Sequence, residues 1–164
     1  KMIVVHYTAI PTLESTLALF KRDNISPDRT FIKEFSTLNV GIHYVIDKDG
    51  KIYNLLPDTL VAPHLIGFNH VALGIENIAA DSTDLTPAQA VSNVNLIRFL
   101  SSRHPSIRFL IGHGEYNNKE LAHFALFKSL NQKYQPYDKS DPGFAFMNQI
   151  RDSLRSKHGM VFEK

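Results

Sequence analysis

Short apolar runs rich in β-branched residues alternate along this chain with longer segments of helical pattern. Strands are predicted at 2–8, 43–47, 51–55, 71–78 and 107–111, and helices at 12–22, 27–36, 87–103, 119–133 and 144–157. The third helix has the clearest start, because Thr86, Pro87 and Gln89 supply an N-cap, a first-turn proline and a capping box. Strands that alternate with helices predict an α/β fold, in which helices flank a central mixed β-sheet.

The length and composition fit one domain. A chain of 164 residues that is 43% hydrophobic can bury a core, and no repeat or linker divides residues 1–164. No uncharged apolar run is long enough to cross a membrane. The formal net charge of +2 gives no reason to expect a nucleic-acid partner. We therefore expect a single domain. A monomer is expected as well, with no sequence signal behind it.

The composition also restricts the chemistry. The chain has no cysteine, which excludes disulfides, thiolate metal sites and a cysteine nucleophile. It has eight histidines, more than structural roles alone would require. His6 ends the first apolar run, and His113 follows the last one between Gly112 and Gly114. Both are candidates for a site, because α/β folds assemble sites at the ends of strands.

Asp141 is a third candidate, although Asp-Pro-Gly is also an ordinary turn sequence. Imidazole and carboxylate are ligands that zinc accepts when thiolates are absent, and three protein ligands leave one position for substrate. The His-Glu-x-x-His pattern of helical zinc proteases is missing. From spacing alone, a zinc site of His6, His113 and Asp141 is one alternative beside ordinary structural roles.

Six segments occur in the order of a known pattern: 3–9, 41–50, 64–77, 85–89, 111–113 and 139–143. With these segments the chain resembles the type 2 N-acetylmuramoyl-L-alanine amidases. That family includes bacterial cell-wall amidases, phage lysozyme-like amidases and peptidoglycan recognition proteins. The resemblance covers about residues 3–155 and implies the family's sheet and flanking helices.

The resemblance implies one zinc ion per chain, held by His6, His113 and Asp141. It implies that Glu76 takes a proton from the attacking water and passes it to the leaving amine. It also implies that Lys139 stabilises the oxyanion formed on the substrate carbonyl.

The family's His-x-x-Gly-aromatic-Asn segment lines the substrate groove. By resemblance, substrate contacts are expected from His64, Asn69 and His70, with loop structure as the alternative role for His70. His43 is expected to be structural in the hairpin. The remaining histidines are expected at the surface: His104, His123 and His158.

One segment departs from the family pattern. His113 and Asp141 are 28 residues apart, a longer connection than in many members. The extra residues, at about 115–138, include Tyr116, Phe124, Phe127, Tyr134 and Tyr137. We expect a lid over the groove, with a packed insertion as the alternative.

The implied reaction is zinc-dependent hydrolysis of the amide bond between N-acetylmuramic acid and L-alanine, in peptidoglycan or its fragments. The alternative is a non-catalytic peptidoglycan-binding module of the same fold, but the metal-ligand, Glu and Lys positions are all filled here. The chain begins with Lys1 rather than Met, which favours a trimmed N-terminus and a periplasmic or extracellular location. A cytoplasmic enzyme that recycles wall fragments is the other location considered.

Overall fold

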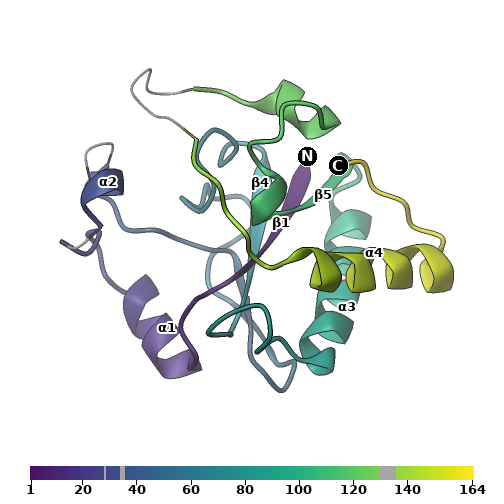
Figure 1. The fold of residues 1–164 in the computed structure, drawn as a ribbon, viewed down its shortest axis with the longest axis horizontal. Coiled ribbons are helices and arrows are strands. Elements are labelled where there is room, and N and C mark those ends of the chain that lie inside the picture. The colour runs from purple at the N-terminus through teal and green to yellow at the C-terminus, as the bar shows by residue number, and fades with distance from the viewer. Residues whose placement is uncertain (28, 34–35, 130–135) are drawn as a thin grey trace.

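The computed structural model describes residues 1–27, 29–33, 36–129 and 136–164 (Figure 1). Within these ranges one sheet has five strands in the order β3-β2-β4-β1-β5. Their bounds are β1 Met2–Tyr7, β2 Tyr44–Ile46, β3 Ile52–Asn54, β4 Ala72–Asn77 and β5 Phe109–Gly112. Neighbouring strands are parallel except β3, which pairs with β2 in the antiparallel direction. The predicted mixed α/β sheet is confirmed.

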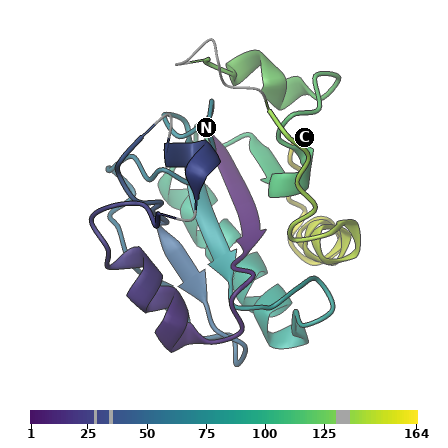
Figure 2. The same cartoon turned by 60° about the vertical axis from the view of Figure 1, so that its left-hand side comes forward.

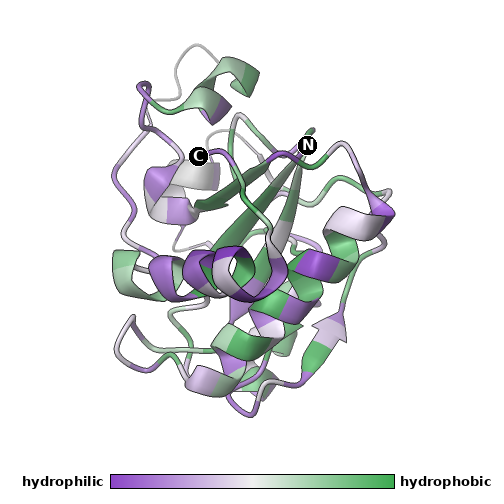
Figure 3. Ribbon diagram, turned by 90° about the vertical axis from the view of Figure 1, so that its right-hand side faces the viewer, coloured by the Kyte–Doolittle hydropathy of each residue, from purple (hydrophilic) through white to green (hydrophobic). Residues whose placement is uncertain are grey.

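Two long helices cover one face of the sheet, α3 (Pro87–Arg103) and α4 (Phe144–His158) (Figure 1). Their apolar side chains pack on alternate residues of the strands, which include Ile3 and Val5 of β1 and Ile75 of β4. Figure 3 shows these two helices in front of the apolar strands; α4 is mostly hydrophilic on its outer side, whereas α3 also exposes Val91 and Phe99. This layer holds the larger core cluster.

The opposite face of the sheet is covered mainly by loops. Met2 and Val4 of β1 and Ile111 of β5 pack there against Leu65 and Phe68 of a long connection. Helix α1 (Leu13–Phe20) packs farther along the same face, on the opposite side of the sheet from α4 (Figure 2). This looser layer leaves room for a cavity.

The best predicted elements are those with local signals. Thr86 accepts a hydrogen bond from the Gln89 backbone, and the Gln89 side chain completes the expected capping box. The 27–36 helix is shorter than predicted: the described part contains α2 (Thr30–Lys33), while residues 28, 34 and 35 lie outside the description. In the described part of the chain, no helix has the length and apolar character needed to cross a membrane.

The helix predicted over 119–133 is wrong for the described residues. A 3₁₀ turn at Ala122–Leu126 (η2) replaces it, after a first turn at His113–Glu115 (η1), and residues 130–133 lie outside the description. The reason is tertiary packing: Phe124 and Phe127 stack 5.1 Å apart and both contact the Phe68 ring. Within the described part of the 115–138 segment, Phe124 and Phe127 pack against the core cluster around Phe68. Tyr134 lies outside the description, and the lid over the groove stays a prediction.

Candidate active site

The parallel register places three predicted site residues side by side. His6 of β1 pairs with Glu76 of β4. On the other side of β1, Val5 pairs with Gly112, so His6 and His113 are the next residues along these strands. Side chains alternate between the two faces of a strand, and Val5 faces the long helices. His6 and Glu76 therefore project from the loop-covered face.

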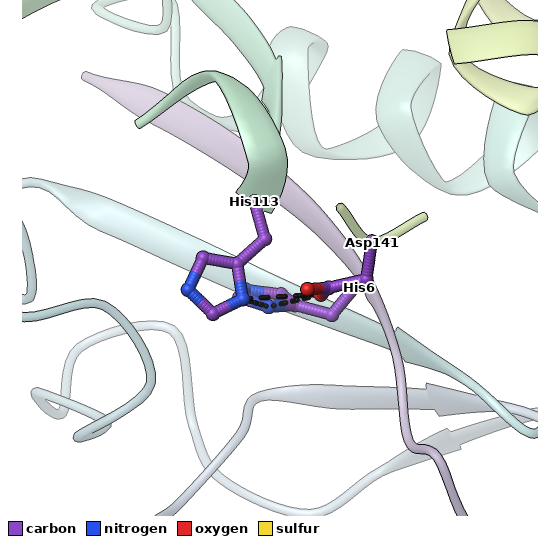
Figure 4. A group of neighbouring side chains, drawn as sticks. All are labelled: His6, His113 and Asp141. Atoms are coloured by element: carbon purple, nitrogen blue, oxygen red, sulfur yellow. Dashed lines mark hydrogen bonds and ion pairs between the residues drawn. The ribbon is translucent and has the colours of Figure 1, made fainter. Parts of the chain in front are cut away.

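Asp141 joins the two histidines to form a compact cluster (Figure 4). His6 Nδ1 lies 2.9 Å from His113 Nδ1 and 3.4 Å from Asp141 Oδ2, and His113 Nδ1 lies 3.0 Å from the same oxygen. One ligand atom from each residue lies within 4.8 Å of the other two. Two imidazoles and a carboxylate are a donor set that fits zinc with a fourth position open.

Gly114 brings the Asp141 segment close to the end of β5. The Gly114 N–H donates a 2.8 Å hydrogen bond to the Asp141 carbonyl. A Cβ atom at Gly114 would lie only 2.8 Å from the Lys139 carbonyl oxygen, so a side chain there would displace the segment. The absence of a side chain at this position thus lets a distant loop supply both Asp141 and Lys139.

The electrostatics of the cluster favour metal binding. Burial lowers the pKa of His113 to about 4, with help from the neighbouring charge of His6 and against the opposing effect of Asp141. Burial alone would raise the pKa of Asp141, but hydrogen bonds from His113 and His6 hold it well below its usual range. At neutral pH, His113 is a neutral imidazole and Asp141 a carboxylate, the protonation states that bind metal.

Glu76 is a carboxyl group with an altered pKa beside the cluster. Burial raises its pKa to about 7, although the charge of His6 opposes the shift. Its Oε2 atom is buried and has no hydrogen-bond partner among the described residues. A carboxyl that titrates near neutral pH can both accept and donate a proton during catalysis.

Lys139 brings a positive charge to the cavity that Glu76 and the His6, His113 and Asp141 cluster line. Its Nζ atom lies 4.4 Å from the centre of the Tyr137 ring, and both residues line the cavity above the cluster. Burial dominates both shifts, and the smaller effect of the Lys139 charge opposes the rise in the pKa of Glu76 and adds to the fall in the pKa of His113.

The cavity has a volume of about 680 Å³. Its lining contains all but one of the predicted site residues: His6, His64, Asn69, Glu76, His113, Lys139 and Asp141. It also contains Arg29, which the sequence patterns did not single out. His70 is exposed and lines a separate hollow of about 200 Å³ beside Asp58 and His104, so the structure does not bring it to the cluster.

His64 and Asn69 have contacts beyond the cavity. The Asn69 side-chain oxygen accepts hydrogen bonds from the backbone N–H groups of His64 (3.0 Å) and Leu65 (2.6 Å). His64 Nδ1 lies 3.1 Å from His6 Nε2. Burial, with the charges of His6 and His43, holds the pKa of His64 well below its usual value, so this imidazole is neutral at pH 7.

Sequence patterns missed a buried amide network behind the site. Asn77 donates a 2.9 Å hydrogen bond to the His6 carbonyl, and Asn93 of α3 donates a 2.7 Å hydrogen bond to the Asn77 side-chain oxygen. Both asparagines are fully buried. The network fixes the His6 backbone against α3, and polar residues on the apolar side of a helix were the signal that could have found it.

His123 is buried, so its prediction as a surface residue is wrong. Its Nε2 lies 3.2 Å from the Tyr116 carbonyl, and its ring packs 5.5 Å from that of Phe68. The aromatic residues near it in the sequence, Phe124 and Phe127, were the signal that could have predicted this burial. His43 is structural as predicted, because its Nδ1 accepts a 3.1 Å hydrogen bond from the Gly74 N–H of β4.

Comparison with known protein families gives a match over most of the chain. Residues 1–144 match the family described as N-acetylmuramoyl-L-alanine amidase (Amidase_2). The chain belongs to this family. A comparison with curated protein sequences gives no match.

Solved structures of the same fold include amidases and recognition proteins. The N-acetylmuramoyl-L-alanine amidase LysC from Clostridium intestinale is 29% identical, with a TM-score of 0.51 over 73% of each chain. An AmpD structure is 22% identical, with a TM-score of 0.64 over 92% of this chain and 82% of that one. Peptidoglycan recognition protein-LE, in complex with tracheal cytotoxin, is 21% identical, with a TM-score of 0.54 over 73% and 72%.

Proposed function

We propose that this protein is a zinc-dependent N-acetylmuramoyl-L-alanine amidase. Its reaction is hydrolysis of the amide between N-acetylmuramic acid and L-alanine, in peptidoglycan or its fragments. The observation that carries the proposal is the convergence of the His6, His113 and Asp141 cluster with Glu76 and Lys139 on one cavity. The family match and the LysC amidase at 29% identity support the same reaction.

His6, His113 and Asp141 would hold the zinc ion, because their donor atoms are close together. The lowered pKa values of His113 and Asp141 give these two ligands their metal-binding protonation states at neutral pH. Zinc, when bound, supplies the Lewis acidity that polarises the scissile carbonyl. The protein itself supplies the ligand geometry and a partly enclosed site.

Glu76 moves the proton in this proposal. Its buried Oε2 atom accepts a proton from the attacking water, and the resulting carboxylic acid protonates the leaving nitrogen of L-alanine. In the metal-free structure, burial raises the pKa of this carboxyl to about 7, so it takes up a proton more readily than an exposed glutamate. The Lys139 ammonium stabilises the negative charge that develops on the carbonyl oxygen.

The cavity would hold the muramoyl group and the first stem residues, and its volume of about 680 Å³ is in the range of small-ligand sites. His64 and Asn69 form part of its wall, whereas His70 could meet only a part of the substrate that extends outside it. We further propose a monomer that acts in the periplasm or outside the cell, with fragment recycling in the cytoplasm as the alternative location.

The experiment that tests this function is digestion of purified peptidoglycan sacculi, followed by mass spectrometry of the soluble products. We expect free stem peptides that begin with L-alanine, and their loss after treatment with a chelator. Glu76→Gln is the matched control: it should bind zinc normally but release these peptides at least about a hundredfold more slowly.

A binding-only module is the second candidate, since recognition protein-LE has the same fold and binds a monomeric peptidoglycan. It predicts that the chain sediments with sacculi but releases no peptide at any zinc concentration. That result would overturn the amidase proposal.

A further inference from the structure

The two ring nitrogens of His6 have different neighbours. Nδ1 faces His113 and Asp141, at 2.9 and 3.4 Å. Nε2 points the other way and lies 3.1 Å from Nδ1 of His64. The two rings meet edge to face, with centroids 5.2 Å apart and an interplanar angle of 85°. His64 therefore contacts the nitrogen of His6 that does not face the cluster.

This contact has a consequence for metal binding. An imidazole that binds a metal through one nitrogen carries its proton on the other, and that N–H needs an acceptor. If His6 binds through Nδ1, the proton is on Nε2, and His64 Nδ1 is the atom placed to accept it. Such an acceptor selects the tautomer of the ligand and limits rotation of its ring.

The His64 ring is itself held in place. Asn69 fixes the backbone at His64 through a 3.0 Å hydrogen bond. A Cβ atom at Gly74 would lie 2.8 Å from His64 Nδ1, so the imidazole packs directly on the bare backbone of β4. The His43 ring lies 5.9 Å away, and its Nδ1 is bound by the Gly74 N–H. Neighbours on several sides thus define the position of Nδ1.

We propose that His64 is a positioning residue for the metal site: it accepts the Nε2 proton of His6 and so orients Nδ1 toward the ion. The inference rests on the proposed zinc site and goes beyond it, because it gives His64 a role in orienting the zinc ligand His6 rather than in binding the substrate. Asn69 acts one step farther out, by holding the loop that carries His64.

The test is the zinc dissociation constant, measured by competition with a chromophoric chelator. His64→Ala should weaken zinc binding about 10- to 100-fold, the usual range for loss of such an acceptor. His64→Asn should restore most of the affinity, because its Oδ1 can take the place of Nδ1 as an acceptor close to the backbone. His158→Ala, at the end of α4, is the control for loss of a histidine and should bind zinc like the parent.

A second measurement reads the tautomer directly. In the zinc-loaded parent, ¹⁵N chemical shifts of the His6 ring should show zinc on Nδ1 and a hydrogen-bonded proton on Nε2, and in His64→Ala the Nε2 shift should move toward that of an N–H without a protein acceptor. Parent-like zinc affinity in His64→Ala would overturn the proposal, as would a His64→Asn variant as weak as His64→Ala. In either case, tight zinc binding by the parent that is lost in His6→Ala would leave the zinc site itself intact.

Discussion

Glu76 illustrates how its place in the sheet changes the chemistry of one side chain. A glutamate on an exposed strand would be ionised at neutral pH, but this one lies in the middle of the sheet beside His6. Burial raises its pKa to about 7, and its Oε2 atom has no hydrogen-bond partner within the described ranges. Burial of a carboxyl oxygen without a hydrogen-bond partner costs free energy. A role in proton transfer gives a reason for a glutamate at this position.

The shifted pKa of Glu76 predicts a pH-dependent stability of the metal-free protein. Because the folded pKa of about 7 lies above the ordinary value of 4.5, the folded state binds this proton more tightly than the unfolded state. The Glu76 contribution to the free energy of unfolding is therefore full below pH 4.5 and falls as the pH rises to 7. The loss is up to about 3 kcal/mol.

Urea unfolding in the presence of a chelator, from pH 4.5 to 8, measures this effect. Glu76→Gln lacks the titrating group, so the stability of this variant relative to the parent should increase up to pH 7 and then stay level. A constant difference across the range would show that Glu76 is not buried as described.

Lys139 allows a separate residue-scale prediction. Lys139→Ala should leave zinc content and thermal stability nearly unchanged, because the ammonium group is not a metal ligand. Steady-state kinetics should show kcat reduced about a hundredfold, with a much smaller change in KM, since the charge on the carbonyl oxygen develops only in the transition state. Lys139→Arg should rescue only in part, because a planar guanidinium differs in shape from an ammonium. A kcat close to the parent value in Lys139→Ala would exclude the oxyanion role.

At the scale of elements, α4 is tied to β5 and to the turn that follows it, which begins at His113. Arg151 of α4 donates hydrogen bonds to Glu115, at 2.5 Å, and to the Leu110 carbonyl, at 2.8 Å. Glu115 in turn accepts a 2.8 Å hydrogen bond from the Gly112 N–H. The ion pair is largely buried, so it braces the turn that presents His113 to the cluster.

Removal of this tether should destabilise the fold. Arg151→Met keeps the apolar stem but leaves Glu115 without its main partner, and we expect a loss of about 2–4 kcal/mol in the free energy of unfolding. Lys164, 3.6 Å from Glu115, can compensate only in part. Arg155→Met on the same helix is the control: its pair with Asp152 is exposed and should contribute less than about 1 kcal/mol. Equal losses in the two variants by urea unfolding would contradict the bracing role.

For single helices, sequence patterns predict the structure where the signal is local. The start of α3 was predictable because Thr86, Pro87 and Gln89 act within one turn. The segment after Lys119 was not, because its shape depends on the contacts of Phe124 and Phe127 with Phe68, more than fifty residues earlier. Local signals carry no information on such a distant partner. The apolar pattern therefore predicts an α-helix where tertiary packing produces a 3₁₀ turn.

At the scale of the whole molecule, the site is a consequence of parallel strand order. Strand alternation and the β4-β1-β5 order align Glu76, His6 and His113, and strand ends were the sequence signal for the two histidines. The family resemblance was needed for Glu76 and Lys139, while the Asp-Pro-Gly sequence alone left an ordinary turn as the alternative for Asp141. The contact between His64 and His6 was not predictable, because it depends on the path of a loop across the sheet.

The central claim is that His6, His113 and Asp141 form one zinc site, and metal analysis of the purified protein tests it most directly. We predict one zinc per chain in the parent and in Glu76→Gln, and loss of zinc in His6→Ala and His113→Ala while both variants stay folded. Retention of one zinc per chain by both histidine variants would contradict the account.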